Sequence, residues 1–421
     1  MKTFIILIGY CAFLPLCIAS SMTLNSSATK IPPQEKSIKI VLNVLPSVRY
    51  AFLPIFKDFE KETGIKVIPQ KFVEDFNFAE NMHQWLVKGI NTPDVLYGHN
   101  DMRLQKMAQL GAVHPISHLW QENGWHSKFR KELIKGSTYE GEQYALPYGM
   151  YTWGLFYKKS ITHKLGPVPD SWQEFKAYCQ KLKNMGISPF PASKEQPYIA
   201  AAWFEYLVLR IHGLAYFNKI MQGEIPFTHS KIQQVFVEWQ ELVKRGFYDT
   251  SYYNMRWEQY LPYFLRDQIG FVLMGTPLGS RIFNDDMQQQ VEFMPFPKIN
   301  DIPKYETAPS NVFFIAANSQ KVVYGEQFLE YISQTRIQNI LSAFLHTSPA
   351  LINAKTGNDK YALQGATSIN NAKGLSPFFD RGADPEFERH AVVSFAKFLK
   401  TGDIDQLTLE LESVRLSVYD N

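Results

Sequence analysis

Apolar residues follow two different periods in the first third of the chain. Short apolar runs at residues 38–45, 65–68 and 94–97 predict buried strands, and the segments at 48–62, 77–89 and 101–110 carry apolar residues at helical spacing. Gly64 and Gly111 close two of these helical segments, as glycines at helix ends commonly do. Pro54 predicts a late start or a kink in the first helix. This alternation of strand and helix predicts a parallel sheet covered by helices on both faces.

A second α/β region follows. Helical spacing recurs at residues 171–182, 199–213, 231–245, 257–266 and 325–333 and in the tail from residue 385, and apolar runs at 270–274 and 311–317 predict strands. Ser171 and Glu174 have the spacing of a capping box at the start of the first of these helices. The chain therefore predicts an α/β protein that is long enough for two domains.

The first residues have the pattern of a targeting segment. Lys2 precedes an apolar run at residues 4–18, and the chain turns polar at Ser20. This predicts a cleaved signal peptide at residues 1–19 and a mobile leader at 20–36, because a membrane span needs about 20 apolar residues. Leu16 in front of Cys17 does not fit a lipoprotein signal, so a periplasmic protein is predicted. Cys179 then remains alone, on the apolar face of a helix, as a small buried hydrophobe.

The aromatic content is the one feature of the composition that suggests a type of ligand. The net charge is +3 without a run of Lys and Arg, so neither a nucleic-acid partner nor an anionic membrane surface is predicted. Aromatic residues make up 14% of the chain, and rings that stack on pyranose faces favour a sugar site. The sequence lacks the G-x-S-x-G, H-E-x-x-H and phosphate-binding-loop patterns. No catalytic residue, no metal site and no cofactor are therefore predicted.

Several stretches occur in an order that is typical of one family. They are Gly64–Val67, Thr92–Leu96, Tyr144–Tyr148 followed by Leu155–Lys159, Pro169–Phe175 and Gln268–Gly275. In this order they resemble extracellular solute-binding protein family 1, the maltose-binding-protein-like receptors of ABC transporters. The resemblance implies a periplasmic binding protein type II-like α/β fold, with two lobes, a hinge and a ligand cleft between them.

The same resemblance implies a domain plan and a function. The N-terminal lobe is expected at residues 37–147 and 299–348, and the C-terminal lobe at 148–298 and 349–421. A sugar or oligosaccharide would bind in the cleft by hinge closure and be delivered to ABC permease subunits in the inner membrane. The protein is expected to act as a monomer and not as an enzyme.

Candidate ligand-binding residues lie at strand ends and lobe crossings, because open α/β sheets bind ligands outside the carboxyl ends of their strands. Asp101 has the alternative role of a helix cap, and Trp203 that of a core residue. Ser310 and Asn311 stand where the family usually has a Gly-Gly pair. The full set is Tyr50, His99, Asn100, Asp101, Tyr148, Tyr151, Trp153, Trp203, Trp257, Gly275, Thr276, Arg281, Ser310 and Asn311.

Other functions remain open at this point. Ferric iron bound by Tyr252 and Tyr253, a phosphate ester bound by arginine, or a polyamine boxed by acidic and aromatic residues would fit the same fold. A periplasmic sensor subunit is a further alternative. Glu205 and Glu258 would be the carboxylates of a periplasmic carbohydrate-active enzyme, which needs two carboxylates at a set distance.

Overall fold

The computed structural model describes residues 36–42, 46–70 and 81–420. The predicted signal peptide, and the predicted leader up to residue 35, lie outside the described residues. None of the helices in the described part of the chain is long and apolar enough to cross a membrane.

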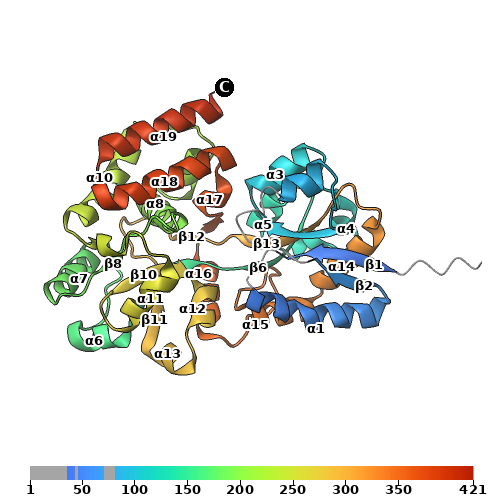
Figure 1. Ribbon diagram of the computed structural model, residues 1–421, viewed down its shortest axis with the longest axis horizontal. Helices are drawn as coiled ribbons and strands as arrows, with labels where there is room; N and C mark the ends of the chain where they lie inside the picture. Colours follow the sequence, from blue (N-terminus) through green and yellow to red (C-terminus); the bar gives the residue numbers. More distant parts are fainter. Residues whose placement is uncertain (1–35, 43–45, 71–80, 421) are drawn as a thin grey trace, which may run out of the picture. The chain divides into compact units, whose positions relative to one another are not determined.

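A five-stranded mixed sheet forms the centre of one lobe, which we call the N-terminal lobe (Figure 1). Strands β1 (Ser37–Val41), β2 (Lys66–Pro69) and β3 (Val95–His99) are parallel, as predicted. Strand β13 (Ser310–Ile315) joins them from late in the chain and runs antiparallel both to β3 and to β6 (Leu146–Met150). The sheet is therefore mixed and not wholly parallel.

Alternate residues of β13 enter two different hydrophobic clusters. Phe313 and Ile315 pack with the helices α1 (Pro46–Thr63), α14 (Val322–Ser333) and α15 (Thr335–Leu345). Val312 and Phe314 pack on the other face, where α3 (Met102–Gln109) contributes Leu104. This period of two is what a strand buried on both faces requires. Figure 1 shows α1 and α15 on one side of the sheet and α3 on the other.

The second, C-terminal lobe has a smaller antiparallel sheet in the order β10–β7–β11. Its strands are β10 (Phe271–Gly275), β7 (Trp153–Lys158) and β11 (Val291–Met294), of which only β10 was predicted from the sequence. Helix α8 (Tyr198–Ile211) is buried along almost its whole length and lies in the main hydrophobic cluster of this lobe. The surrounding helices are α7 (Trp172–Asn184), α10 (Ser230–Lys244), α11 (Trp257–Leu265), α12 (Thr276–Ile282), α18 (Pro385–Thr401) and α19 (Ile404–Tyr419).

Two predicted local features of α7 have different outcomes. Cys179 is buried at 1% exposure among apolar residues, as predicted. The capping box is not formed, because the Ser171 hydroxyl donates to the Glu174 carboxylate and makes no hydrogen bond to the helix backbone.

The remaining elements are short or connect these layers. They are α4 (Ser117–Glu122), α5 (Lys131–Gly136), α6 (Lys159–Leu165), α9 (Leu214–Met221), α13 (Asp285–Gln290), α16 (Lys360–Asn371), α17 (Phe379–Gly382), β4 (Thr138–Tyr139), β5 (Glu142–Gln143), β8 (Phe190–Pro191), β9 (Tyr248–Asp249), β12 (Tyr305–Thr307) and β14 (Gly374–Ser376). A π-helical turn at His83–Val87 lies within the helix predicted at residues 77–89, of which residues 77–80 are outside the described part.

The chain passes from the first sheet to the second between Met150, where β6 ends, and Trp153, where β7 begins. Tyr206 of α8 fixes this passage, because its hydroxyl donates to the Trp153 carbonyl at 2.8 Å and lies 3.2 Å from the Thr152 hydroxyl. The same hydroxyl accepts from Thr307 of β12 at 3.1 Å. One buried side chain of the C-terminal lobe therefore holds two of the segments that join the lobes.

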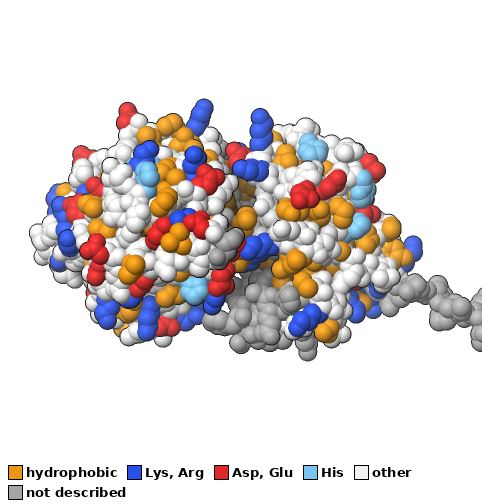
Figure 2. All heavy atoms as spheres, turned by 90° about the horizontal axis from the view of Figure 1, so that it is seen from above, with side chains coloured by type: hydrophobic (Ala, Val, Ile, Leu, Met, Phe, Trp, Pro, Cys, Tyr) orange, Lys and Arg blue, Asp and Glu red, His pale blue; other side chains and the backbone are white. Residues whose placement is uncertain are grey.

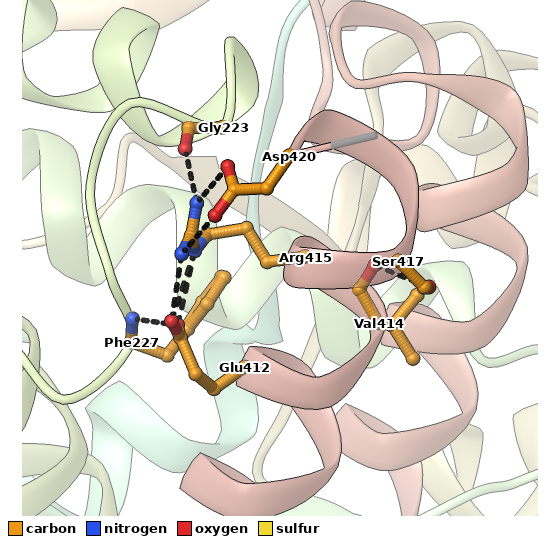
Figure 3. A network of polar contacts seen from close by, with 7 residues as sticks. All are labelled: Gly223, Phe227, Glu412, Val414, Arg415, Ser417 and Asp420. Atoms are coloured by element: carbon orange, nitrogen blue, oxygen red, sulfur yellow. Dashed lines mark hydrogen bonds and ion pairs between the residues drawn. The ribbon is translucent and has the colours of Figure 1, made fainter.

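Helix α19 is anchored to the C-terminal lobe by a charged network (Figure 3). Arg415 forms ion pairs with Glu412 at 2.8 Å and Asp420 at 3.1 Å, and donates to the Gly223 carbonyl at 3.0 Å. Glu412 also accepts the Phe227 backbone N–H at 2.7 Å. This arginine, with 8% of its side chain exposed, has two carboxylate partners, as a buried charge requires.

Candidate ligand-binding site

The passage from β6 to β7 brings polar and aromatic residues of both lobes together. Tyr151 and Trp153 come from the passage itself, His99 from the end of β3, and Arg381 from the short helix α17. The group, which we call the interlobe cluster, consists of Tyr97, His99, Tyr151, Trp153, Tyr198, Asn311, Phe378 and Arg381.

Two aromatic rings of the cluster meet Phe378 edge to face. Its ring centroid lies 5.5 Å from that of Tyr151 and 5.6 Å from that of Trp153, at interplanar angles of 68° and 79°. Trp153 in turn meets Tyr198 at 6.0 Å and 90°. An edge-to-face contact places the edge of one ring against a face of the other, and Trp153 is only partly buried within this group.

Arg381 connects the two lobes through this group. Its two terminal nitrogens lie 3.1 Å from His99 Nδ1 and 3.0 Å from the Tyr151 hydroxyl. The guanidinium carbon also lies 5.3 Å from the centre of the Phe378 ring, within the range of a cation–π contact.

His99 is held neutral in this position. Burial, together with the positive charges of Arg381 and Arg103, places the pKa of His99 well below its ordinary value. A neutral imidazole has one nitrogen that accepts, so Nδ1 receives the Arg381 N–H and the other nitrogen carries the proton. Asn311 Oδ1, which accepts from the Tyr97 hydroxyl at 3.1 Å, lies 3.2 Å from the same nitrogen and makes no hydrogen bond to it in this tautomer.

Glu205 of α8 binds the backbone next to the cluster. It is 2% exposed within α8, and its carboxyl group accepts the backbone N–H of Phe379 at 2.7 Å. Burial raises the pKa of Glu205 well above its ordinary value. This contact fixes the start of α17 and thereby the direction in which Arg381 leaves the backbone.

Ion pairs join the lobes beside the cluster. Arg103 and Lys106 of α3 lie 3.0 Å from Glu388 and 2.5 Å from Asp384, respectively. Figure 2, which looks down on this side, shows Lys and Arg side chains next to Asp and Glu along the furrow between the lobes. The lobes are thus in contact on this side.

Known proteins with the same architecture identify the family. Residues 45–339 match the family described as bacterial extracellular solute-binding protein, which is more than half of the 421 residues. The chain belongs to this family.

Two curated relatives are similar to this solute-binding protein in sequence. An uncharacterized ABC transporter extracellular-binding protein of Pyrococcus horikoshii is 23% identical over 345 residues, which cover 79% of this chain and 76% of the relative. A probable sugar-binding periplasmic protein of Rhizobium meliloti is 23% identical over 171 residues, which cover 40% and 41%. The predicted family resemblance is confirmed.

Solved structures of receptors have the same fold. The bacterial solute receptor AcbH, described as having an exclusive preference for β-D-galactopyranose, superposes with a TM-score of 0.84 at 21% identity, over 92% of this chain and all (100%) of the receptor. A chitin oligosaccharide binding protein gives 0.80 at 17% identity, over 91% and 99%. The raffinose complex of the binding protein RafE gives 0.73 at 16%, over 91% and 99%. These likenesses confirm the predicted fold class.

Four predicted ligand contacts are explained by structural roles instead. Asn100 is 7% exposed and bonds to the Leu133 carbonyl and the Ser137 hydroxyl. Asp101 caps α3 by accepting from the backbone of Arg103 and Leu104, the alternative that the sequence offered, and burial raises its pKa to about 6. The rings of Tyr148 and Trp203, 1% and 2% exposed, pack within hydrophobic clusters.

Other predicted residues contribute backbone or lie at different places. Thr276 and Ser310 are 1% and 0% exposed, so their side chains are covered in this conformation, and the Thr276 N–H donates to the Thr152 carbonyl at 3.0 Å. Gly275 approaches the cluster closely, since a Cβ atom there would lie 3.2 Å from Trp153 Nε1. Tyr50 is 71% exposed on α1, Trp257 packs at the start of α11, and the Arg281 side chain lies outside the described residues.

The structure thus brings together Tyr151, Trp153, His99 and Asn311 from the predicted set. Sequence reasoning missed Tyr97, Tyr198, Phe378 and Arg381. The Pro197–Tyr198 step and the run Ser376–Gly382, both followed by helical spacing, were the available signals.

Proposed function

We propose that this solute-binding protein captures a sugar or oligosaccharide in the interlobe cluster and delivers it to the permease of an ABC importer. The observation that carries this proposal is the composition of the cluster, in which the rings of Tyr151, Trp153 and Phe378 stand beside the hydrogen-bonding groups of His99 and Arg381. Ring faces suit the apolar faces of a pyranose, and the polar groups suit its hydroxyls.

The position of the cluster supports capture by lobe closure. His99 and Asn311 belong to the N-terminal lobe, whereas Phe378 and Arg381 accompany the C-terminal lobe. A ligand that touches both sets is bound more tightly when the lobes are together, so binding shifts the population toward the closed form. A permease that recognises the closed form would then receive only loaded receptor.

Three further statements belong to the same proposal. The protein is exported to the periplasm by the signal peptide read at residues 1–19. It acts as a monomer, and its partners are ABC permease subunits in the inner membrane. Support comes from the relatives named above, one of which is described as an ABC transporter extracellular-binding protein and another as a sugar-binding periplasmic protein.

Calorimetric and thermal-shift titrations of the purified mature protein test the proposal. The ligands are galactose, chitin oligosaccharides and raffinose, with glycerol phosphate, a polyamine and Fe³⁺ as the competing cargo classes. A cargo at 100 times its Kd stabilises the protein by about 2.7 kcal/mol, which gives a clear shift. If only Fe³⁺ or only the polyamine shifts the transition, the sugar proposal is wrong.

A matched pair of tyrosine variants locates the binding site. Tyr151→Phe removes a hydroxyl that accepts from Arg381, and Tyr144→Phe makes the same change outside the cluster, beside the apolar residues on the α3 face. We expect the first variant to weaken sugar binding by roughly two- to tenfold, since a neutral hydrogen bond between the Tyr151 hydroxyl and a sugar hydroxyl contributes about 0.5–1.5 kcal/mol. Equal effects of both variants would place the sugar elsewhere.

A further inference from the structure

Arg381 differs in its partners from three arginines that join segments of the fold, Arg103, Arg210 and Arg415. Arg210, with 4% of its side chain exposed, pairs with Glu306 at 2.7 Å, and Arg415 pairs with Glu412 and Asp420 (Figure 3). Arg103 lies near both Asp101 and Glu388, at 3.7 and 3.0 Å. Each of these guanidinium groups has a carboxylate to balance it.

The partners of Arg381 are neutral instead. It donates to His99 Nδ1 and to the Tyr151 hydroxyl, and no carboxylate oxygen among the described residues lies within ion-pair distance of it. A guanidinium has five N–H donors, so three remain without an acceptor from these two contacts. Buried charges are normally paired with a charge of opposite sign, and Arg381 has no such partner at ion-pair distance in the described part of the chain.

The carboxyl groups around Arg381 are engaged elsewhere. Asp101 caps α3, Glu388 is paired with Arg103, and Glu205 accepts the Phe379 N–H. Asp380, next in the chain, and Asp101 both act on the Arg381 charge, but neither forms an ion pair with it.

A second donor near Arg381 is also unsatisfied. The indole nitrogen Nε1 of Trp153 is buried and has no hydrogen-bond partner. Trp153 and Arg381 both pack against Phe378, at 5.6 and 5.3 Å from its ring centre. The cluster therefore offers a surplus of N–H donors beside ring faces, which complements a ligand group that only accepts.

We propose that the cargo is an acidic sugar, a uronic acid or an oligosaccharide that contains one, whose carboxylate pairs with Arg381 while its pyranose ring stacks in the interlobe cluster. This inference rests on the proposed sugar function and names the class of sugar. A carboxylate has two acceptor oxygens that match the planar fork of an arginine. A neutral sugar would leave the charge of Arg381 unbalanced when the lobes close.

Two other cargo classes fit the same residues less well. A polyamine carries positive charge and would be repelled by Arg381. A phosphate ester is usually held by several cationic groups or by backbone N–H groups at a helix start, and the cluster offers a single guanidinium.

Titration with matched pairs of sugars tests the inference. The pairs are galactose and galacturonate, glucose and glucuronate, mannose and mannuronate, and the neutral and acidic trisaccharides of each configuration, with glycerol phosphate as an additional arm. For at least one configuration we expect the acidic member to bind tenfold or more tightly than the neutral one. The preference should fall as ionic strength rises, although less than for an exposed ion pair.

Variants of Arg381 assign the preference to this residue. Arg381→Gln should lower affinity for the acidic sugar by tenfold or more and change the affinity for its neutral counterpart much less. Arg381→Lys keeps the charge without the planar fork and should give an intermediate loss. Arg389→Gln removes an exposed arginine of α18 that pairs only with its own helix at 2.6 Å, and should leave both affinities unchanged.

The outcomes separate the inference from the proposed function. If neutral sugars bind as tightly as acidic ones, or if only glycerol phosphate binds, the acidic-sugar inference is wrong. In the first case the sugar function stands. If no sugar of either class binds to a protein that unfolds cooperatively, the proposed function itself fails. Should Arg381→Gln not fold, the Lys variant and the salt dependence of the native protein still decide the matter.

Discussion

Trp203 and Trp153 offer a direct test of which tryptophan is structural and which belongs to the site. Trp203 is 2% exposed, and its ring centroid lies 4.6 Å from that of Phe190, 5.4 Å from Tyr248 and 5.4 Å from Phe296. Trp153 is only partly buried and contacts Phe378 and Tyr198 edge to face.

Replacing Trp203 by alanine removes a fully packed ring from the core of the C-terminal lobe. Truncations of buried aromatic side chains cost about 3–5 kcal/mol, because the lost transfer energy is joined by a cavity term. The three ring contacts of Trp203 place it in the upper part of that range. At roughly 2 °C per kcal/mol for a unit of about 200 residues, a loss of about 4–5 kcal/mol should lower the unfolding midpoint by roughly 8–10 °C.

Trp153→Ala should give the opposite pattern. Its side chain is partly exposed, so the loss of stability should stay below about 2 kcal/mol. Loss of a stacking ring in a binding site commonly costs about 2 kcal/mol of affinity, or roughly thirtyfold in Kd. Trp203→Phe is the control for volume and should recover most of the stability that Trp203→Ala loses.

Urea titration of the unliganded variants, followed by calorimetry with the cargo, measures both quantities. The reasoning is refuted if Trp203→Ala is as stable as the native protein while its ligand affinity collapses. It is equally refuted if Trp153→Ala is the more destabilised variant and binds cargo normally.

Two further predictions concern the contacts beside the cluster. Burial, assisted by Asp380, raises the pKa of Glu388 to about 7, so the folded protein holds this proton more strongly than the unfolded chain, whose glutamates titrate near pH 4.3. The stability contributed by this group is therefore present at low pH and lost as the pH rises from about 4.5 through 7, and Glu388→Gln should flatten that slope in urea titrations at about pH 5 and about pH 8. Lys106 and Asp384 form an ion pair between the lobes. In a double-mutant cycle on cargo affinity, Lys106→Met and Asp384→Asn should show a coupling energy of about 0.2–1 kcal/mol. Asparagine is chosen because it can still cap α18. Strictly additive effects of the two substitutions would show that this pair does not help to hold the lobes together.

Local patterns predicted the elements of the fold better than their relative directions. The alternation of Val312, Phe313, Phe314 and Ile315 is a property of neighbouring residues, and a strand buried on both faces follows from it. That β13 runs antiparallel to β3 is a property of the path between them, which passes through a large part of the C-terminal lobe. The strands β7 and β11 were missed, although they belong to the same sheet as the predicted strand β10.

The residues of the candidate site were also predicted only in part. Tyr151 and Trp153 were predicted from the place where the chain changes lobes, which a motif marks in the sequence. Tyr148, only three residues earlier, was expected at the ligand on the same ground, yet its ring stacks on Phe313 at 4.7 Å. Residue type and spacing cannot distinguish a ring in the core from one in a cleft when both lie within a few residues of each other in the chain.

Arg381 shows most clearly what the sequence withholds. Its partner His99 is 282 positions away, and its direction is set by Glu205, a buried carboxyl group on a third element. Read alone, an arginine after Asp380 in a short polar turn has no more meaning than any exposed arginine. The inference of an acidic cargo rests on the finding that no carboxylate of the described residues lies at ion-pair distance from Arg381. That finding requires the positions of all neighbouring side chains. For this reason the class of cargo, more than the fold or the family, depends on the three-dimensional arrangement of a few side chains.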